Sequence, residues 1–565
     1  MKYMKINKLI SNYWLLILAL IVASILRLWA LGVNPPGLTP DETAIGYNAY
    51  TIIKTGRDEY GKVLPFIFKS FGEYKVGLYI YLTAPIVGLL GLSEFSTRLL
   101  SAISGIVSVY LLYILSTKLF GKKIGIAAAF IASVNPWLIY FSRAAWEANL
   151  SLTLTLAAIY LFLKALEKAK YLLLSAILFA LTLLTYQGAK FSTAIVLLLL
   201  LITYYRQFRE KFLQRNIRIT VLSALAGFVI CLPIISSFFT GQVFRLKIYS
   251  IFSYPRPQEY LETFLAEGGE KIGDLNYYIY HTETFNFVRV ALGRWFSHFS
   301  GKFLFFAGDW ENPSHTAPYQ GVLLLSDIIL LPLALFAIFR KKLEPGHLFI
   351  IFWLVLAPLT AALSRDQVNA VRSMVTAAPM VMVLSFGLVA LWDFIRSSRY
   401  KLFLYLIFVP IFTGSLLYFL DAYFVHIPKH NSNFWRYGYR EAARVITPIK
   451  NNYQNIVFEQ SFNQPYIYLL FYEAMDNPKN FDVAKYQNQE NLVDSQYKGD
   501  VGFQEKIDNI LFERIDWQVL KNQHGTLVIA SPTSLPPDFT KDANVIREIK
   551  YLNGRDIAFE IIEIR

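Results

Sequence analysis

The chain has 565 residues, of which 55% are hydrophobic, 16% aromatic and 17% charged, and its mean hydropathy is +0.40. This composition excludes an ordinary soluble protein of the same length and predicts a polytopic α-helical membrane protein. The formal net charge of +14 does not indicate nucleic-acid binding, because Lys and Arg gather in short loops beside apolar segments, as the positive-inside bias requires. The single cysteine, Cys231, excludes an intramolecular disulfide and a Cys-based metal site.

The first apolar segment runs from about Tyr13 to Leu31 and is long enough to cross the roughly 30 Å hydrocarbon core of a bilayer. Trp14 and Trp29 near its ends are typical of the membrane interfaces. A cleaved signal peptide would have a shorter apolar region and a small-residue cleavage site, so we expect a retained anchor with a cytoplasmic N-terminus. The loop from Gly32 onward then lies outside.

The next apolar segment, Val76 to Leu92, decides the topology of all later loops. It has about 17 residues, near the lower limit for a span, and it contains Pro85 and several glycines. We expect it to dip into the interface without crossing, which gives about eleven spans in total. The further predicted spans are 97–119, 124–141, 147–166, 171–187, 189–205, 217–239, 321–339, 347–363, 371–392 and 402–423.

With this assignment every strongly basic short loop falls on the cytoplasmic side, including those around Lys122, Arg209 and Arg340, whereas the reverse assignment would place them outside. The C-terminus is then extracytoplasmic. The polar connections 142–149, 185–190, 240–320 and 364–372 join the first loop on the outer face. The sequence therefore predicts that its reactive polar groups gather at one face of the membrane.

After the last span, the composition becomes that of a soluble protein. An amphipathic helix is expected from Tyr439 to Asn451, and strands at NIVFEQ and TLVIASP. The chain closes with a predicted hairpin that turns on Asn553-Gly554. We therefore expect a transmembrane domain at 1–425, whose first outer loop at 32–96 carries the chemistry, and a small extracytoplasmic α/β domain at 426–565. The latter has no nucleotide-binding glycine fingerprint or nucleophile elbow, which leaves substrate handling or structural support.

The outer loops hold the side chains that one reaction needs, namely the transfer of a sugar from a polyprenyl phosphate to an acceptor hydroxyl. The phosphate leaving group needs cations near the bilayer surface, and the acceptor hydroxyl needs a base. Asp41 or Glu42 supplies the carboxylate, and Lys75, Arg143 and Arg372 supply the cations. A glycosidase would instead need two carboxylates that flank the bond, with one of them protonated.

Several of these residues also form a pattern that resembles glycosyltransferase family 39, which includes the protein O-mannosyltransferases and the lipid A aminoarabinose transferases and has the GT-C membrane fold. The resemblance covers roughly residues 10 to 425. It rests on Asp41-Glu42 after the first span, Glu73 and Lys75 before the stretch GLYIYLTAP, Arg98-Leu99 at the start of the next span, and Arg143 with Glu147 after the third.

The resemblance implies an inverting transfer from a lipid-phosphate sugar, without a nucleotide-sugar donor. It implies that Asp41 is the catalytic carboxylate and that Glu147 is the acidic residue of the second outer loop. It also implies that Arg372 is the arginine of the late outer loop, residues 364–372. Glu73 and Lys75 are adjacent in the aminoarabinose transferases but are separated here by Tyr74, so the pattern does not define the donor sugar.

Other interpretations of the same residues stay open. Asp41 and Glu42 follow Pro40, which is also typical of a helix N-terminus, and Arg143 and Glu147 are four residues apart, as in a helical ion pair. Lys75 and Arg372 could anchor lipid headgroups.

Six of the seven histidines fall outside, but no pair has the spacing of metal ligands; His315 is the best exception and a candidate substrate contact. No cofactor is certain, and a divalent metal near the first-loop acids is left open.

The sequence thus favours a membrane glycosyltransferase in a prokaryotic cell membrane. Its expected partners are the bilayer, a polyprenyl-phosphate sugar and a protein, lipid or glycan acceptor. The alternatives are a transporter of lipid-linked saccharides, which would need charges along a path through the membrane, and a non-catalytic scaffold, which would tolerate the loss of Asp41.

Overall fold

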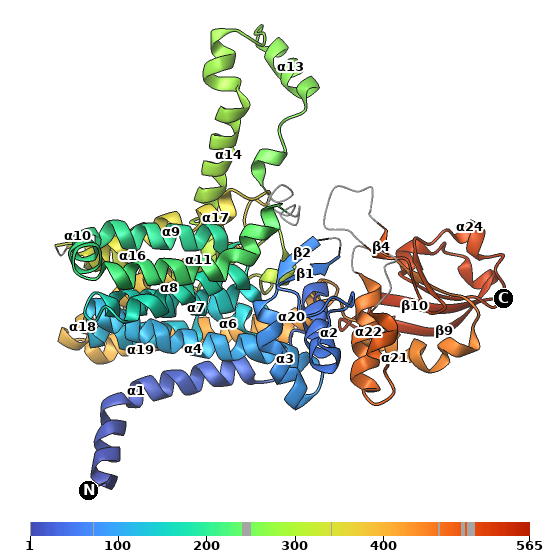
Figure 1. Ribbon diagram of the computed structural model, residues 1–565, viewed down its shortest axis with the longest axis horizontal. Coiled ribbons are helices and arrows are strands. Elements are labelled where there is room, and N and C mark those ends of the chain that lie inside the picture. The colour runs from blue at the N-terminus through green and yellow to red at the C-terminus, as the bar shows by residue number, and fades with distance from the viewer. Residues whose placement is uncertain are drawn as a thin grey trace.

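The computed structural model describes residues 2–71, 73–239, 250–340, 342–460, 464–487, 492–493 and 503–565. A bundle of long helices makes up most of the molecule, and a smaller α/β unit lies at one end of it (Figure 1). The fold class predicted from the sequence is therefore confirmed. The first loop lies between the bundle and the α/β unit.

The bundle helices follow the apolar segments of the sequence. They are α1 (Lys2–Leu28), α4 (Glu94–Phe120), α5 (Lys122–Val134), α6 (Pro136–Ser142), α7 (Glu147–Ala165), α8 (Tyr171–Thr185), α9 (Ala189–Thr203), α10 (Tyr205–Phe208), α11 (Ile217–Phe239), α15 (Asp327–Phe339), α16 (Pro345–Leu356), α17 (Leu359–Ala362), α18 (Ala377–Ser397) and α19 (Lys401–Asp421). Each predicted span has a helical counterpart in this set. In the described ranges, six helices are long and apolar enough to cross a membrane, or eight if two bent pairs each count as one span. The full number of crossings and their orientation stay predictions.

Burial separates the helices that face lipid from those at the centre of the bundle. Only 11% of the apolar window of α11, and likewise of α19, is buried inside the protein, whereas 83% of the window that contains α18 is buried. An apolar surface that is exposed on a membrane helix faces hydrocarbon, so α11 and α19 lie at the lipid boundary and α18 lies in the interior. α18 packs closely on α15, where Gly387 approaches the backbone of Leu330.

The segment that we predicted to dip is α3 (Leu78–Leu90), a helix of 13 residues that includes Pro85. At 1.5 Å per residue it is about 20 Å long, which is also the length of α15, the counterpart of a predicted span. It lies beside α2 (Pro40–Thr55) at the end of the bundle that carries the first loop (Figure 1). The length of α3 does not separate a dip from a crossing, so the dip stays a prediction.

The first loop is a folded unit that consists of α2, β1 (Ile67–Ser70) and β2 (Glu73–Val76). The two strands pair antiparallel, with Phe68 opposite Lys75. α2 begins with a capping box in which Thr39 and Glu42 satisfy each other's backbone N–H groups. The helix-start interpretation of this stretch is therefore correct, and it places Asp41 in the exposed first turn.

The C-terminal unit contains a six-stranded sheet with the order β6-β7-β3-β8-β10-β9. Its strands are β3 (Ile456–Glu459), β6 (Lys506–Ile507), β7 (Ile510–Glu513), β8 (Leu527–Ala530), β9 (Ala543–Lys550) and β10 (Ile557–Ile564), and its helices include α21 (Tyr439–Ile449), α22 (Pro465–Asp476), α23 (Val483–Tyr486) and α24 (Trp517–Leu520). β3 runs parallel to β7 and β8. The predicted helix, both predicted strands and the closing hairpin are confirmed, with Gly554 in the turn at φ 72°.

Two further helices, α13 (Gln258–Glu267) and α14 (Glu283–Ser297), form an arm that projects from the side of the bundle (Figure 1). The base of the arm is tied to the late outer loop, because the guanidinium of Arg294 donates to the carbonyl oxygen of Ser364. The indole of Trp295 donates to the carbonyl oxygen of Val355 (2.7 Å).

The C-terminal unit holds the first loop by hydrogen bonds from side chains. The hydroxyl of Tyr468 donates to the carbonyl oxygen of Leu38 (2.9 Å), and the amide of Gln487 donates to the hydroxyl of Thr55 (2.7 Å) and to the carbonyl oxygen of Asp58 (3.1 Å). These bonds hold the first loop against the C-terminal unit.

Glu59 is buried in this interface. Its Oε1 accepts from the amide of Asn48 (3.2 Å), and its backbone N–H donates to Oδ1 of the same residue (3.0 Å). Burial raises the pKa of Glu59 from 4.5 to about 8, and the neighbouring charge of Asp58 acts in the same direction. The hydrogen bond from Asn48 and the charge of Lys75 lower the pKa, but their effect is smaller.

The close packing of α18 on α15 predicts the effect of one methyl group. A Cβ atom at Gly387 would lie 2.1 Å from the carbonyl oxygen of Leu330, whereas a Cβ at Gly414 in α19 would meet nothing within 4 Å. We expect Gly387→Ala to destabilise the protein by about 1–3 kcal/mol and Gly414→Ala to have little effect. Thermal unfolding of both variants in the same lipid nanodiscs measures this, and equal stability would contradict the described packing.

The raised pKa of Glu59 predicts how stability depends on pH. From about pH 4.5 to about 8 this carboxyl group is ionised in the unfolded chain but stays protonated in the folded protein. The free energy of unfolding should therefore fall by up to about 1.4 kcal/mol per pH unit as the pH rises, and level off above about 8. We expect Glu59→Gln to remove this slope.

Unfolding midpoints measured from pH 5 to 9 provide the comparison, with Glu548→Gln, a half-exposed position on β9, as the control. If the slopes of the wild type and of Glu59→Gln are the same, the folded protein does not hold Glu59 protonated.

Candidate functional site

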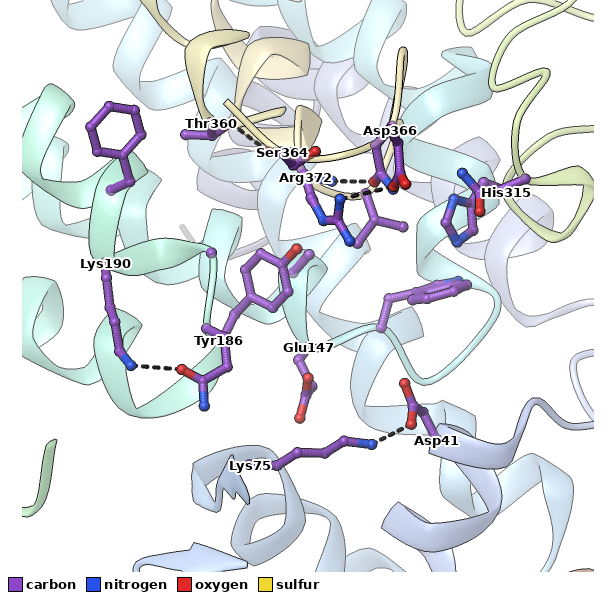
Figure 2. Close-up of a pocket in the computed structure, with 18 of the residues that line it drawn as sticks. Asp41, Lys75, Glu147, Tyr186, Lys190, His315, Thr360, Ser364, Asp366 and Arg372 are labelled. Atoms are coloured by element: carbon purple, nitrogen blue, oxygen red, sulfur yellow. Dashed lines mark hydrogen bonds and ion pairs between the residues drawn. The ribbon is translucent and has the colours of Figure 1, made fainter. Parts of the chain in front are cut away.

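A cavity of about 660 Å³ opens where the first loop, the start of α7, the α8–α9 connection and the late outer loop meet (Figure 2). Its polar lining consists of Asp41, Ser70, Lys75, Glu147, Tyr186, Gln187, Lys190, Ser250, Asn312, His315, Thr360, Ser364, Arg365, Asp366, Asn369 and Arg372. Five of the eight side chains that we selected from the sequence are in this lining. Polar loops that are distant in sequence thus converge on one side of the bundle.

Asp41 and Lys75 form an ion pair at the first-loop side of the cavity. Asp41 lies in the first turn of α2 and its side chain is 52% exposed, whereas the Lys75 side chain on β2 is 8% exposed. The Lys75 ammonium also lies 5.2 Å from the centre of the Phe71 ring. The lysine is therefore held in place while the carboxylate stays accessible. Glu73 belongs to the same strand, but its side chain is outside the described residues.

Glu147 begins α7 and projects toward the centre of the cavity in the view of Figure 2. In this view Lys75 lies below it, Asp41 lies to its right, and Arg372 lies above. The Glu147 carboxylate therefore lies between the Lys75 side and the Arg372 side of the cavity lining.

The late outer loop positions Arg372 by a set of short polar contacts. Its guanidinium donates to the carboxylate of Asp366 (2.8 Å), and the amide of Asn369 donates to the same carboxylate oxygen (2.8 Å). The hydroxyl of Thr360 donates to the carbonyl oxygen of Arg372 (2.6 Å). About a fifth of each of the Arg372 and Asp366 side chains is exposed, so the guanidinium faces the cavity from a fixed position.

His315 lies in the cavity wall, next to the late loop. Its Nδ1 contacts a carboxylate oxygen of Asp309 (2.8 Å), and its ring meets the ring of Trp146 edge to face, with 5.2 Å between the centroids. Burial alone would favour the protonated form of Asp309, but the bonds from His315 and from the backbone of Ala370 are stronger and hold its pKa below the ordinary value.

Glu42 does not line the cavity, so its placement does not support the predicted role as a catalytic carboxylate. Its side chain is 1% exposed and accepts bonds from the guanidinium of Arg98 (3.0 Å), the backbone N–H of Ala145 (2.8 Å) and the backbone N–H of Thr39 (3.0 Å). A carboxylate enclosed by these donors holds the first loop in place.

Arg143 also departs from the expectation, because its guanidinium lies behind the cavity wall. It donates to the carbonyl oxygens of Leu26 (2.9 Å), Trp29 (2.7 Å) and Asn34 (2.9 Å), and it lies 4.8 Å from the centre of the Phe424 ring. Arg143 therefore closes the end of α1 and does not reach the cavity. This placement does not support the predicted contact of Arg143 with the substrate.

Sequence reasoning missed several lining residues, including Asp366, Gln187 and Lys190. They belong to polar connections that were recognised as outer loops, but nothing in those short stretches separates a lining residue from a solvated one. Nothing in the sequence indicated a role for Asp309, because it is one acid in a long loop and its partner, His315, is six residues away.

Within the described ranges no group of three or more His, Cys, Asp or Glu side chains is arranged to hold a metal ion. Beside Asp41, positive charge is supplied by the chain itself, through Lys75.

Comparisons with known proteins agree with this architecture. A family model described as dolichyl-phosphate-mannose-protein mannosyltransferase matches residues 78–236. Two crystal structures of ArnT from Cupriavidus metallidurans, one bound to undecaprenyl phosphate and one in the apo state, superpose with TM-scores of 0.54 and 0.53 at 12% and 11% identity. Each alignment covers 98% of this chain and 98% of that protein.

A structure of the Archaeoglobus fulgidus oligosaccharyltransferase, tethered with an acceptor peptide, gives a TM-score of 0.49 at 14% identity and covers 82% of this chain and 63% of that one. No curated protein sequence matches the chain. At these identities the two ArnT structures define the fold alone, and their alignments extend over both the bundle and the C-terminal unit. The chain is therefore a multi-pass membrane protein with the GT-C fold of the membrane glycosyltransferases, and its residues 78–236 match the mannosyltransferase family model.

Proposed function

We propose that the chain transfers a glycosyl group from a polyprenyl-phosphate-linked donor to a hydroxyl group of an extracytoplasmic acceptor. The observation that carries this proposal is the cavity at one side of the membrane bundle, where the accessible carboxylate of Asp41 shares a lining with the cations Lys75 and Arg372. The match to the mannosyltransferase family model supports it. So does the shared fold with an ArnT structure that is bound to undecaprenyl phosphate.

The proposed reaction is a single displacement with inversion at the anomeric carbon. Asp41 accepts the proton of the acceptor hydroxyl while that oxygen forms a bond to the anomeric carbon. The bond from this carbon to the phosphate oxygen breaks, and the polyprenyl phosphate leaves with the electron pair. Because negative charge develops on the phosphate, Lys75 and Arg372 stabilise the transition state.

The ion pair between Lys75 and Asp41 implies that the donor binds before Asp41 acts as the base. The ammonium group is confined between Phe71 and the carboxylate, so a donor phosphate that enters the cavity competes with Asp41 for it. Donor binding would then weaken the hold of Lys75 on the carboxylate and leave Asp41 to accept a proton. We assign Glu147, His315 and Glu73 to contacts with the sugar or the acceptor, and Glu42 and Arg143 to support of the site.

The remaining features of the proposal concern location and organisation. We place the N-terminus in the cytoplasm and the cavity outside a prokaryotic cell membrane, and we divide the chain into a transmembrane domain at 1–425 and an extracytoplasmic domain at 426–565. The hydrogen bonds from Tyr468 and Gln487 to the first loop suggest that the second domain braces the catalytic loop. The acceptor is a protein, a lipid or a glycan.

Removing the proposed base provides the direct test. Asp41→Asn keeps the size of the side chain but cannot accept the proton, so we expect the rate of sugar transfer from a panel of defined polyprenyl-phosphate sugars to fall at least about 100-fold. Binding of undecaprenyl phosphate, measured by native mass spectrometry, should persist. Asp421→Asn, the same change at an exposed position outside the cavity, is the control.

If Asp41→Asn transfers sugar as fast as the wild type, Asp41 is not the base. If the wild type binds no polyprenyl phosphate, the scaffold interpretation is favoured. If it binds a lipid-linked saccharide and moves it across a vesicle membrane without transfer, the transporter interpretation is correct.

The role of Arg372 predicts a separate effect on binding. Loss of a charged hydrogen bond to phosphate costs about 1.5–3 kcal/mol, so we expect Arg372→Ala to weaken undecaprenyl phosphate binding by about 10- to 100-fold and Arg372→Lys to weaken it less. Arg399→Ala, at a stacked arginine outside the cavity lining, is the control for loss of positive charge. Unchanged affinity in Arg372→Ala would place the phosphate elsewhere.

A further inference from the structure

We propose that Asp309 and His315 form an oriented pair in which Asp309 fixes the imidazole so that Nε2 accepts a hydrogen bond from a hydroxyl group of the bound sugar or of the acceptor. The inference rests on the proposed function, specifies the contact that His315 makes, and adds a positioning residue. The family resemblance in the sequence does not include this pair.

The tautomer of His315 follows from the environment of Asp309. The carboxylate is fully buried and receives the backbone and side-chain N–H groups of Asn312 (3.1 and 3.0 Å), the backbone N–H of Ala370 (2.8 Å) and Nδ1 of His315 (2.8 Å). Three of these four bonds come from groups that can only donate. The charged carboxylate therefore requires a proton on Nδ1 of His315, which leaves Nε2 with its lone pair when the ring is neutral.

The ring of His315 is packed against aromatic groups in the cavity wall, from which we infer that Nε2 faces the cavity. The ring of His315 meets the rings of Trp146 (5.2 Å, 81°) and Phe141 (6.1 Å, 61°) edge to face, so two sides of the imidazole are covered by aromatic groups. About 13% of the side chain stays accessible, and the residue belongs to the cavity lining. Figure 2 shows His315 in the wall near Asp366. Across the described part of the chain, Nε2 makes no hydrogen bond.

Asp309 also binds the backbone of Ala370, so the same carboxylate holds both His315 and the loop that carries Arg372. The same oxygen that binds His315 also accepts the backbone N–H of Ala370, two residues before Arg372. The neighbouring backbone N–H, that of Asn369, donates to Nε2 of His298 (3.2 Å). The late loop is therefore fixed relative to the imidazole through one buried carboxylate. We assign Asp309 as a positioning residue and His315 as the residue that touches the substrate.

Two substitutions at His315 separate contact from packing. His315→Phe keeps an aromatic ring beside Trp146 but has no acceptor, and we expect it to reduce kcat/KM by at least 10-fold. His315→Gln keeps a side-chain oxygen that accepts a hydrogen bond and should recover part of this loss. Undecaprenyl phosphate affinity should be unchanged in both variants, because the contact is to a hydroxyl group and not to phosphate.

The Michaelis constants then identify the source of the hydroxyl group. A higher KM for the acceptor alone assigns it to the acceptor, and a higher KM for the donor alone assigns it to the transferred sugar. If His315→Phe transfers sugar as fast as the wild type, the contact does not exist. That result differs from failure of the proposed function, in which the wild type itself transfers no sugar.

A double-mutant cycle tests whether Asp309 acts through His315. We expect Asp309→Asn to lower kcat/KM in the wild type but to have a much smaller effect in the His315→Phe background. Additive effects would mean that Asp309 only holds the late loop.

The tautomer can be tested without turnover. Nitrogen NMR of ¹⁵N-histidine-labelled protein at alkaline pH, with His315 assigned by its absence in His315→Phe, should show Nδ1 protonated and Nε2 unprotonated. The opposite tautomer would overturn the proposal.

Discussion

The buried ion pair between Arg98 and Glu42 is the interaction on which the site depends. Arg98 lies near the start of the long helix α4. Its guanidinium also donates to the carbonyl oxygens of Leu31 (3.2 Å) and Pro35 (2.9 Å), while Glu42 accepts the backbone N–H of Ala145. Two charges without solvent are stable only when their partners are all in place. This pair therefore joins the end of α1, the start of α2, the start of α4 and the α6–α7 connection, and it fixes the turn of α2 that presents Asp41.

The polar residues of the outer face fall into two sets that burial distinguishes. Arg98, Glu42 and Arg143 are fully buried and bind backbone groups, so they shape the loops. Asp41 and Arg372 are partly exposed, and each is held by another charged side chain that also faces the cavity. The buried set holds the loops, and the partly exposed set presents its charges to the cavity. This arrangement suits a site that must hold a phosphate without rearrangement, because electrostatic stabilisation is strongest when the groups are fixed beforehand.

Much of this architecture could be predicted from the sequence, because long apolar segments, a capping sequence and the Asn553-Gly554 turn each have a local physical cause. The convergence of Asp41, Lys75 and Arg372 on one cavity also agrees with the prediction that their loops share a face. The direction of a single side chain has no such local cause. Arg143 follows the same kind of span as other outer-loop residues, yet its guanidinium turns toward three carbonyl groups at the end of α1. The role of Asp309 depends on residues 315 and 370, whose proximity only the tertiary fold creates.

The central claim is that the cavity holds the phosphate of a polyprenyl carrier between Lys75 and Arg372, within reach of Asp41. An experimental structure of this protein with undecaprenyl phosphate, at a resolution that defines the phosphate group, tests it most directly. The account predicts phosphate oxygens at hydrogen-bond distance from the Lys75 ammonium and the Arg372 guanidinium, with the Asp41 carboxylate facing the same space. A phosphate bound outside this cavity, or in contact with neither cation, would contradict it.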